Sequence, residues 1–153
     1  MPDFEVTGAD DFFKLSKALK AAGRTDLRRE LHTGLRRAAR PLVAKTRAEA
    51  RRRLPKRGGL AERVAKTPQR VQVRTGNQTA GVRIVVGGGS NAARGANSGA
   101  FRHPVFGNRD VWVTQRVTPG WFDEPLRKSA PEVRRDLERA MQDMADKIVK
   151  DAK

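Results

Sequence analysis

The stretch RTDLRRELHTGLRRAARPLVAKTRAEARRRLPKR, residues 24–57, combines a regular set of apolar residues with a dense positive charge. Its apolar residues recur at spacings of four, four, three and four, and they are Leu27, Leu31, Leu35, Ala38 and Leu42. Positions at these spacings fall on one side of an α-helix. The stretch therefore predicts a long amphipathic helix that begins near Thr25.

Two prolines set limits to this helix. Pro41 lies inside the pattern, where proline removes a backbone hydrogen bond and clashes with the preceding turn. We expect a kink there, or two helices divided near Arg40. The run from Leu54 to Gly59, which contains Pro55 and two glycines, ends the helix. Residues 60–64 are expected to form either a helical turn or an extended segment.

The charge of the chain is unevenly distributed. The whole chain carries 33 Lys and Arg against 17 Asp and Glu, a formal charge of +16. Residues 24–57 hold 13 basic against 3 acidic residues, and residues 58–122 hold 9 against 2, whereas residues 123–153 are neutral with 8 of each. Such an excess indicates an anionic partner, either nucleic acid or an acidic protein face.

The residues before the basic stretch predict a strand and a helix. Phe4-Glu5-Val6 alternates as a short edge strand does. Asp10 or Asp11 can cap a helix through Ala22, because a short acceptor satisfies the free amides of a first turn. The apolar residues of this helix are Phe13, Leu15 and Leu19, and Gly23 ends it.

The centre of the chain predicts a small antiparallel sheet. Val71–Val73 and Val82–Val86 alternate apolar and polar residues, and Gly76-Asn77-Gln78 lies between them, which is typical of a hairpin. A third strand is expected over Asp110–Val117. Residues 88–100 are rich in Gly, Ser and Asn, so we expect a long mobile loop that becomes ordered against a partner.

The end of the chain predicts one more helix. Pro131 suits the first turn of a helix that begins near Ser129. Apolar residues follow at helical spacing, and they are Val133, Leu137, Met141, Met144 and Ile148. The expected fold is one α+β domain over residues 1–153, with N-terminal helices and a C-terminal helix packed on the sheet.

Few residues could carry chemistry. The chain has no cysteine and only two histidines, His32 and His103, so neither a metal site nor a cofactor is expected. Asp10-Asp11 and Asp123-Glu124 are read as a helix cap and a loop surface. The glycines at 87–89 lack the Gly-Lys-Ser/Thr ending of a phosphate loop. We therefore expect no enzyme, no catalytic residue and, since no apolar run approaches about 20 residues, no membrane partner.

Three interpretations of the basic stretch remain open: direct nucleic-acid binding through phosphates, a surface that faces acidic proteins or DNA without gripping it, and a solvated helix face. The second is favoured, because no recognition module is visible and the aromatic residues lie far away in sequence. The residues expected to face DNA or an acidic partner are Arg28, Arg29, Arg36, Arg37, Arg40, Lys45, Arg47, Arg51 and Arg52.

Aromatic residues and prolines are dense between Phe101 and Pro125. We expect at least two of Phe106, Trp112 and Phe122 to pack between the sheet and the last helix. Together with the glycine-rich segment, this region is predicted to contact neighbouring subunits. The residues proposed for that interface are Ser90, Asn91, Arg94, Asn97, Phe101, His103, Phe106, Trp112 and Trp121.

The order of these motifs resembles the neck and tail-completion proteins of tailed phages with long non-contractile tails. The motifs that carry the resemblance are Phe4-Glu5-Val6-Thr7-Gly8, Leu54-Pro55 followed by Arg57-Gly58-Gly59-Leu60, His103-Pro104-Val105-Phe106-Gly107, and Gln115 followed by Pro119-Gly120-Trp121-Phe122. Gly58 stands where the family commonly has Thr, which is a mild departure.

The resemblance implies a structural protein of the virion that is made in the host cytoplasm and forms a ring, with a hexamer favoured, at the head–tail junction. Its implied partners are copies of itself, the neighbouring connector or stopper and tail-tube or tail-terminator proteins, and the packaged double-stranded DNA that passes nearby. The alternative is a small, non-specific nucleic-acid-binding protein.

Overall fold

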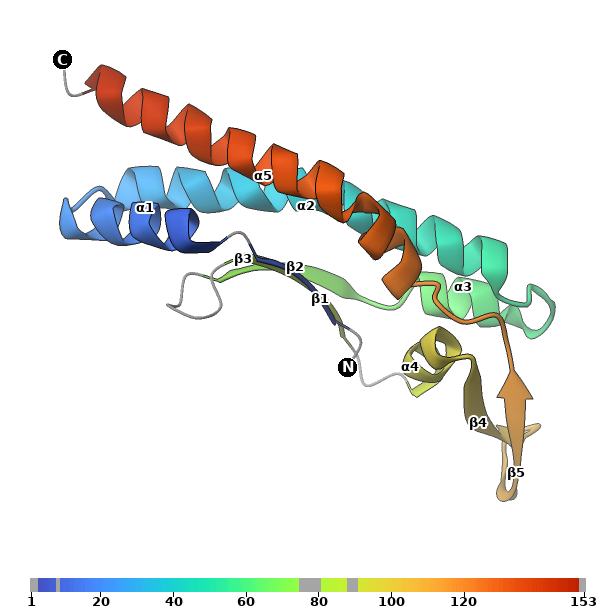
Figure 1. The fold of residues 1–153 in the computed structure, drawn as a ribbon. Helices are drawn as coiled ribbons and strands as arrows, with labels where there is room; N and C mark the ends of the chain where they lie inside the picture. Colours follow the sequence, from blue (N-terminus) through green and yellow to red (C-terminus); the bar gives the residue numbers. More distant parts are fainter. Residues whose placement is uncertain (1–2, 8, 75–80, 88–90, 152–153) are drawn as a thin grey trace. The chain divides into compact units, whose positions relative to one another are not determined.

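A computed structural model describes residues 3–7, 9–74, 81–87 and 91–151, and of residues 3–7 and 9–13 it describes the backbone alone (Figure 1). The elements in chain order are β1 (Asp3–Thr7), α1 (Ala9–Ala21), α2 (Thr25–Arg53), a 3₁₀ turn (Arg57–Gly59), α3 (Leu60–Ala65), β2 (Gln69–Arg74), β3 (Gly81–Val86), α4 (Asn91–Ser98), β4 (Ala100–Val105), β5 (Asn108–Arg116) and α5 (Asp123–Asp151). The α+β prediction is confirmed.

The chain divides into two compact units. The first comprises Met1–Phe4, Leu42–Arg70 and Val85–Lys128, and the second comprises Glu5–Pro41, Val71–Ile84 and Ser129–Lys153. The boundaries fall inside β1, α2, β2, β3 and α5, so each of these elements contributes to both units. The two units are described separately below, and the expected single domain stays a prediction.

The second unit is built on the leucine face of α2. Leu27, Leu31 and Leu35 are at most 2% exposed, as their helical spacing predicts. After these three leucines, Ala39 is buried on α2, whereas Ala38, which the spacing predicted, is only half-buried. Val133, Leu137 and Met144 are buried on α5, as expected for the apolar face of that helix.

Contacts within the second unit show that α5 runs antiparallel to this part of α2. Arg24 donates to Asp151 at 3.4 Å, near one end of both segments. Lys147 donates to Glu30 at 2.5 Å, which is further along α2 and further back along α5. A Cβ placed on Gly34 would lie 3.8 Å from that of Ala140. Residue numbers that rise on α2 as they fall on α5 define an antiparallel pair.

Pro41 does not divide the helix. The prediction of two helices near Arg40 is wrong, because α2 is one α-helix of 29 residues with Pro41 inside it. Pro41 is itself exposed, whereas Ala39 before it and Leu42 after it are buried. Burial on both sides of the proline stabilises helical backbone that a lost hydrogen bond alone would weaken.

The first sheet has the strand order β1-β3-β2. The predicted strands at residues 4–6, 71–73 and 82–86 are confirmed, and the last two are neighbours in the sheet. On β3 the side chains of Val82, Ile84 and Val86 are buried and alternate with half-buried ones, because successive side chains of a strand point to opposite faces. The expected turn at residues 76–78 lies outside the described part of the chain.

The prediction of a mobile loop is wrong for residues 91–98, which form helix α4. Ala93 and Ala96 are at most 1% exposed, and their spacing of three places them on one side of the helix. The Nε1 of Trp121 donates to the Ala93 carbonyl oxygen at 3.0 Å. A partner 28 residues away therefore stabilises a segment whose own composition favours disorder.

Helix α5 begins at Asp123, six residues before the predicted start at Ser129. Asp123 and Glu124 belong to its first turn and not to a loop. The Oδ1 of Asn97 accepts hydrogen bonds from the amides of Phe122, at 3.0 Å, and Asp123, at 3.3 Å. Amides at a helix start need such acceptors, and here the acceptor comes from α4.

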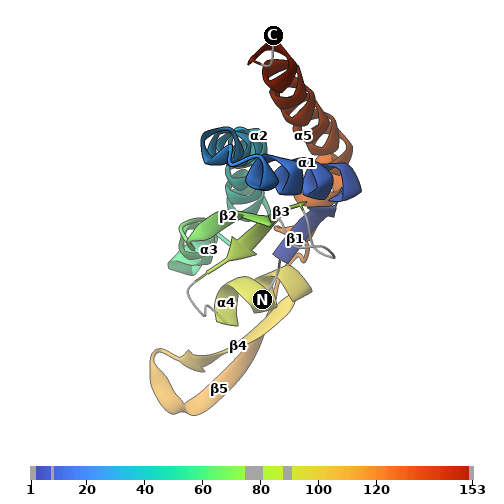
Figure 2. The ribbon, with the colours of Figure 1, turned by 90° about the vertical axis from the view of Figure 1, so that its left-hand side faces the viewer.

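The predicted third strand forms a separate two-stranded sheet. β5 pairs antiparallel with β4, in a register that sets His103 opposite Val113 and Pro104 opposite Trp112. This hairpin projects beyond α3 and α4 of the same unit in both views (Figures 1 and 2). Phe122 is buried as expected, but Phe106 and Trp112 are exposed. The prediction that at least two of these three aromatic residues pack in the core is therefore wrong.

A matched pair of glycine substitutions tests how closely α4 packs against β4. At Gly95 of α4 a Cβ would meet the Cβ of Phe101 at 2.3 Å and the Ala100 carbonyl oxygen at 2.6 Å. We expect Gly95→Ala to lower the free energy of unfolding by about 1–3 kcal/mol.

Gly34→Ala is the control, because its Cβ would meet only ordinary van der Waals contact. A helix-interior alanine at that position should raise stability by about 1 kcal/mol. Urea denaturation of both variants measures the two changes in the free energy of unfolding. If Gly95→Ala stabilised the chain as much as Gly34→Ala does, α4 and β4 would not be in close contact.

Candidate functional site: a basic helix and an exposed hairpin

The nine basic residues singled out on α2 have different environments. Seven of them are exposed, whereas Arg28 and Arg47 are half-buried. The Nε of Arg51 donates to Glu62 at 2.7 Å, and Arg52 donates to Glu49 through two nitrogens. Ion pairs within the chain therefore already offset the charges of Arg51 and Arg52. Lys45 also interacts within the chain, so the available basic surface is smaller than the sequence predicts.

In the second unit, part of this basic set lines a hollow of about 400 Å³. The lining residues are Thr25, Arg28, Arg29, His32, Thr33 and Arg36, all from the first three turns of α2. The Nε of Arg28 is buried and forms no hydrogen bond with any residue that the structure describes. None of these three guanidinium groups belongs to an ion pair among the described residues. The hollow therefore concentrates uncompensated positive charge.

The pKa of His32, which lines this hollow, is affected by the charges around it. Burial lowers the pKa of His32 below its ordinary value, and the nearby charges of Arg28 and Arg36 lower it further. The neighbouring carboxylates on α2 have other partners, since Asp26 pairs with Arg24 and Glu30 with Lys147. Sequence reasoning did not single out His32 as part of this site, although its spacing of four from Arg28 and Arg36 indicates one helix face.

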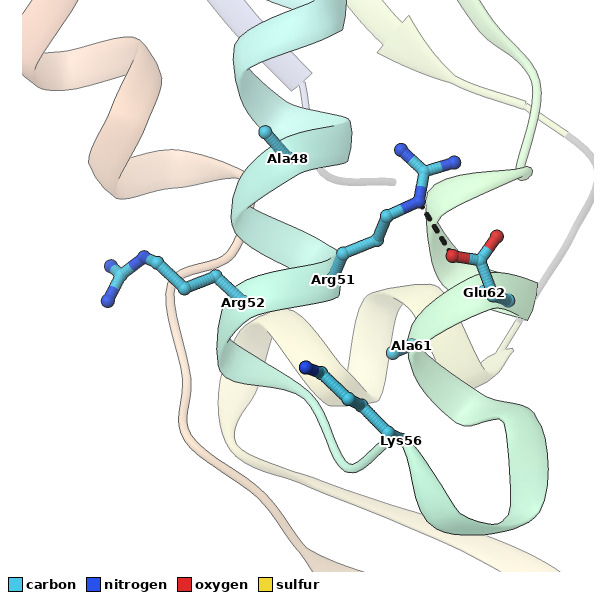
Figure 3. Close-up of a pocket in the computed structure, with 6 residues that line it drawn as sticks. All are labelled: Ala48, Arg51, Arg52, Lys56, Ala61 and Glu62. Atoms are coloured by element: carbon cyan, nitrogen blue, oxygen red, sulfur yellow. Dashed lines mark hydrogen bonds and ion pairs between the residues drawn. The ribbon is translucent and has the colours of Figure 1, made fainter.

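A second hollow, of about 670 Å³, lies in the first unit (Figure 3). Ala48, Arg51, Arg52 and Lys56 line it from α2 and the segment that follows, and Ala61 and Glu62 line it from α3. Figure 3 shows the Arg51 guanidinium turned toward the Glu62 carboxylate across the hollow. This ion pair engages Arg51 and Glu62, and Arg52 is paired with Glu49, so three of the four charged groups that line the hollow already have partners.

Arg53, which sequence reasoning did not single out, is the most strongly bonded arginine of α2. Its Nε donates to Glu49 at 2.7 Å, and its other nitrogens donate to Glu124 and to the Pro119 carbonyl oxygen. Its side chain is only 12% exposed. The spacing of four from Glu49 indicated one of these bonds, but no sequence signal pointed to Glu124, 71 residues away. Arg53 is thus a structural residue that ties α2 to the start of α5.

The tip of the β4–β5 hairpin carries an exposed aromatic residue on strained backbone. Val105 pairs with Asn108, so Phe106 and Gly107 form a two-residue turn. Both have positive φ, +48° for Phe106 and +81° for Gly107, as a type I′ turn requires. Bulky residues rarely adopt this conformation. Phe106 is nevertheless fully exposed, at 104% of its reference area.

Exposed apolar residues concentrate on the same hairpin. Of the five exposed large apolar residues in the described part of the chain, four lie between residues 106 and 113. They are Phe106, Val111, Trp112 and Val113, and the fifth is Val149 on α5. The Arg102 guanidinium lies 5.9 Å from the centre of the Trp112 ring, a cation–π distance. Exposed apolar patches of this kind mark interaction surfaces.

The remaining residues proposed for the interface differ in how exposed they are. Trp121 is wholly buried, so its assignment to the interface is wrong: its ring packs in the core of the first unit and its Nε1 bonds to α4. Asn97 is engaged in capping α5. Asn91 and Arg94 are exposed on α4, and Phe101 and His103 are half-buried with their rings 5.6 Å apart. Ser90 lies outside the described residues.

The described residues contain no group of three or more His, Cys, Asp or Glu that could hold a metal ion. No helix among them is long and apolar enough to span a membrane. No family model, curated protein or solved structure matches this chain.

The ion-pair cluster of the first unit predicts a pH dependence of stability. Arg52, followed by Arg53, lowers the pKa of Glu49 from 4.5 to about 2. Because the folded pKa is depressed, the cluster stabilises the fold fully above the ordinary pKa, and this contribution is lost as pH falls from about 4.5 to 2. Glu49→Gln should remove about 1–2 kcal/mol of that pH dependence, after allowance for solvent screening.

Denaturant unfolding across this pH window measures the effect. Glu138→Gln, on an exposed position of α5, is the matched control. An identical pH dependence in the wild type and in Glu49→Gln would contradict the proposed role of the cluster.

Proposed function

We propose that this chain is a structural, non-enzymatic protein of a tailed-phage virion. It assembles with copies of itself into a ring at the head–tail junction, and a hexamer is favoured. In this proposal the ring completes or connects the tail around the DNA channel, and it contacts the neighbouring connector or stopper and tail-tube or tail-terminator proteins.

The observation that carries the proposal is that Phe106 is fully exposed and lies on strained backbone at the tip of the hairpin. A hairpin turn with two positive φ angles is most stable with Asn, Asp or Gly at its first position. Phe at that position costs on the order of 1–3 kcal/mol of backbone strain, and in the isolated chain its exposed ring returns no burial energy. A strained and exposed aromatic residue is accounted for if another protein buries it. Val111, Trp112 and Val113 on strand β5 of the same hairpin are also exposed.

The position of the hairpin also supports an assembly role. Its base is tied to the first unit by the bond from the Val117 amide to the Gly99 carbonyl oxygen, at 2.9 Å, and from the Gly120 amide to the Asn97 carbonyl oxygen, at 2.9 Å. A tip presented on a fixed base loses less entropy on binding than a free loop does. The segment His103–Gly107, part of the resemblance to neck and tail-completion proteins, forms the second half of β4 and the turn of this hairpin.

Phe106→Asn separates assembly from folding. Asn suits the positive φ that Phe106 adopts, so we expect the free energy of unfolding of the isolated chain to rise by about 1 kcal/mol. Self-association, measured by sedimentation velocity, should fall at least tenfold, because the apolar tip is lost.

Val149→Asn is the matched control, since Val149 is also exposed but lies on α5. It should leave self-association unchanged. A Phe106→Asn protein that associates as the wild type does would contradict the assembly role of the hairpin.

The location in the virion needs a separate experiment. Cryo-electron microscopy of particles at the head–tail junction should show density for this chain as a closed ring. Absence of the chain from that junction would overturn the proposal, whatever the behaviour of the purified protein.

A further inference from the structure

We infer that the hollow on the first three turns of α2 is a binding site for the phosphate groups of a nucleic-acid backbone. The site is formed by Arg28, Arg29, His32 and Arg36, with Thr25 and Thr33 at its edge. It lies in the second unit of the chain, whereas the exposed hairpin lies in the first. The inference therefore does not depend on the proposed ring.

The chemistry of the lining is that of an anion site. Three guanidinium groups offer only hydrogen-bond donors, and they match the geometry of phosphate oxygens. The Thr33 hydroxyl already donates to the Arg29 carbonyl oxygen at 3.0 Å, so it contributes to the shape of the hollow and not to its donors. No carboxylate of the described residues lines the hollow.

A second observation distinguishes this site from an ordinary solvated helix face. Arg28 lines the hollow, and its Nε is buried and has no hydrogen-bond partner among the described residues. A buried donor without a partner costs about 1–3 kcal/mol, and this cost is recovered if the half-buried Arg28 side chain turns toward an acceptor bound in the hollow. Burial, followed by the nearby charges of Arg28 and Arg36, lowers the pKa of His32, which is consistent with a positive potential in the hollow.

The extent of the basic row favours a polyanion over a single small anion. Residues 25 to 36 span about 16 Å along the helix axis at 1.5 Å per residue. Arg40 continues the row four residues beyond Arg36 and is exposed. One phosphate cannot contact the whole length of this row. Duplex DNA presents about one negative charge per 1.7 Å of its axis, a density that acidic protein surfaces rarely reach.

The purified full-length chain and a short, fluorescently labelled DNA duplex provide the test. Binding is followed by anisotropy over a series of KCl concentrations, for the wild type and for Arg28→Ala/Arg36→Ala. Arg63→Ala/Arg135→Ala is the matched control, because it removes two exposed charges from α3 and α5 that have no ion pair among the described residues. The variant Arg29→Ala/Arg36→Ala, both exposed, replaces the first pair if loss of half-buried Arg28 impairs folding.

The cluster variant should bind the duplex at least tenfold more weakly than the wild type, with a log–log salt slope smaller by about two. The control variant should stay within about twofold of the wild type. In the wild type the NMR signals of the His32 ring should shift when DNA is added, and this shift should be absent in the cluster variant.

Several results would overturn the inference. Equal losses of DNA affinity in the cluster variant and the control variant would show that binding depends only on the total charge of the chain. Tighter binding of polyglutamate than of DNA at matched salt, lost in the cluster variant, would identify an acidic protein partner instead. His32 signals that shift with inorganic phosphate but not with DNA would limit the site to small anions. Absence of DNA binding by the wild type would also overturn it.

Discussion

The side chain of Asn97 holds together the part of the first unit on which the exposed hairpin depends. Its Oδ1 accepts from the first amides of α5, and its Nδ2 donates to the Asp123 carboxylate at 2.6 Å. Its backbone oxygen accepts from Gly120. One residue of α4 thus sets where α5 begins and where the chain returns from the hairpin. Together with the bond from the Val117 amide to the Gly99 carbonyl oxygen, these bonds fix the base of the hairpin.

The hairpin and the basic hollow are each energetically unfavourable in the free chain, for different physical reasons. At Phe106 the backbone adopts a conformation that disfavours its own side chain, so the isolated chain carries strain and an exposed ring together. In the hollow, the guanidinium groups of Arg28, Arg29 and Arg36 lie close together and have no ion pair among the residues that the structure describes. Both arrangements cost stability in the free protein. Both become favourable when a partner of suitable chemistry, apolar in one case and anionic in the other, covers them.

Internal ion pairs decide which of the many arginines remain available to a partner. Arg53 bonds to Glu49 and Glu124 and is nearly buried, so it stabilises the fold. Arg29 and Arg36 have no ion pair among the described residues and remain exposed. A count of charges along residues 24–57 treats these residues alike. The distinction matters because a cation that is already paired within the chain must give up that pairing before it neutralises a DNA phosphate and releases counterions.

The amino-acid sequence by itself determined the features that depend on neighbours along the chain. The leucine spacing of α2, its end before Pro55 and the alternation of β3 were all predicted, because periodicity and proline chemistry act over a few residues. Tertiary structure alone decided that α4 is a helix, that α5 begins at Asp123 and that Trp121 is buried. Each of these depends on hydrogen bonds between residues 25 to 28 positions apart, through Asn97 and Ala93, and local sequence patterns do not encode such distant partners.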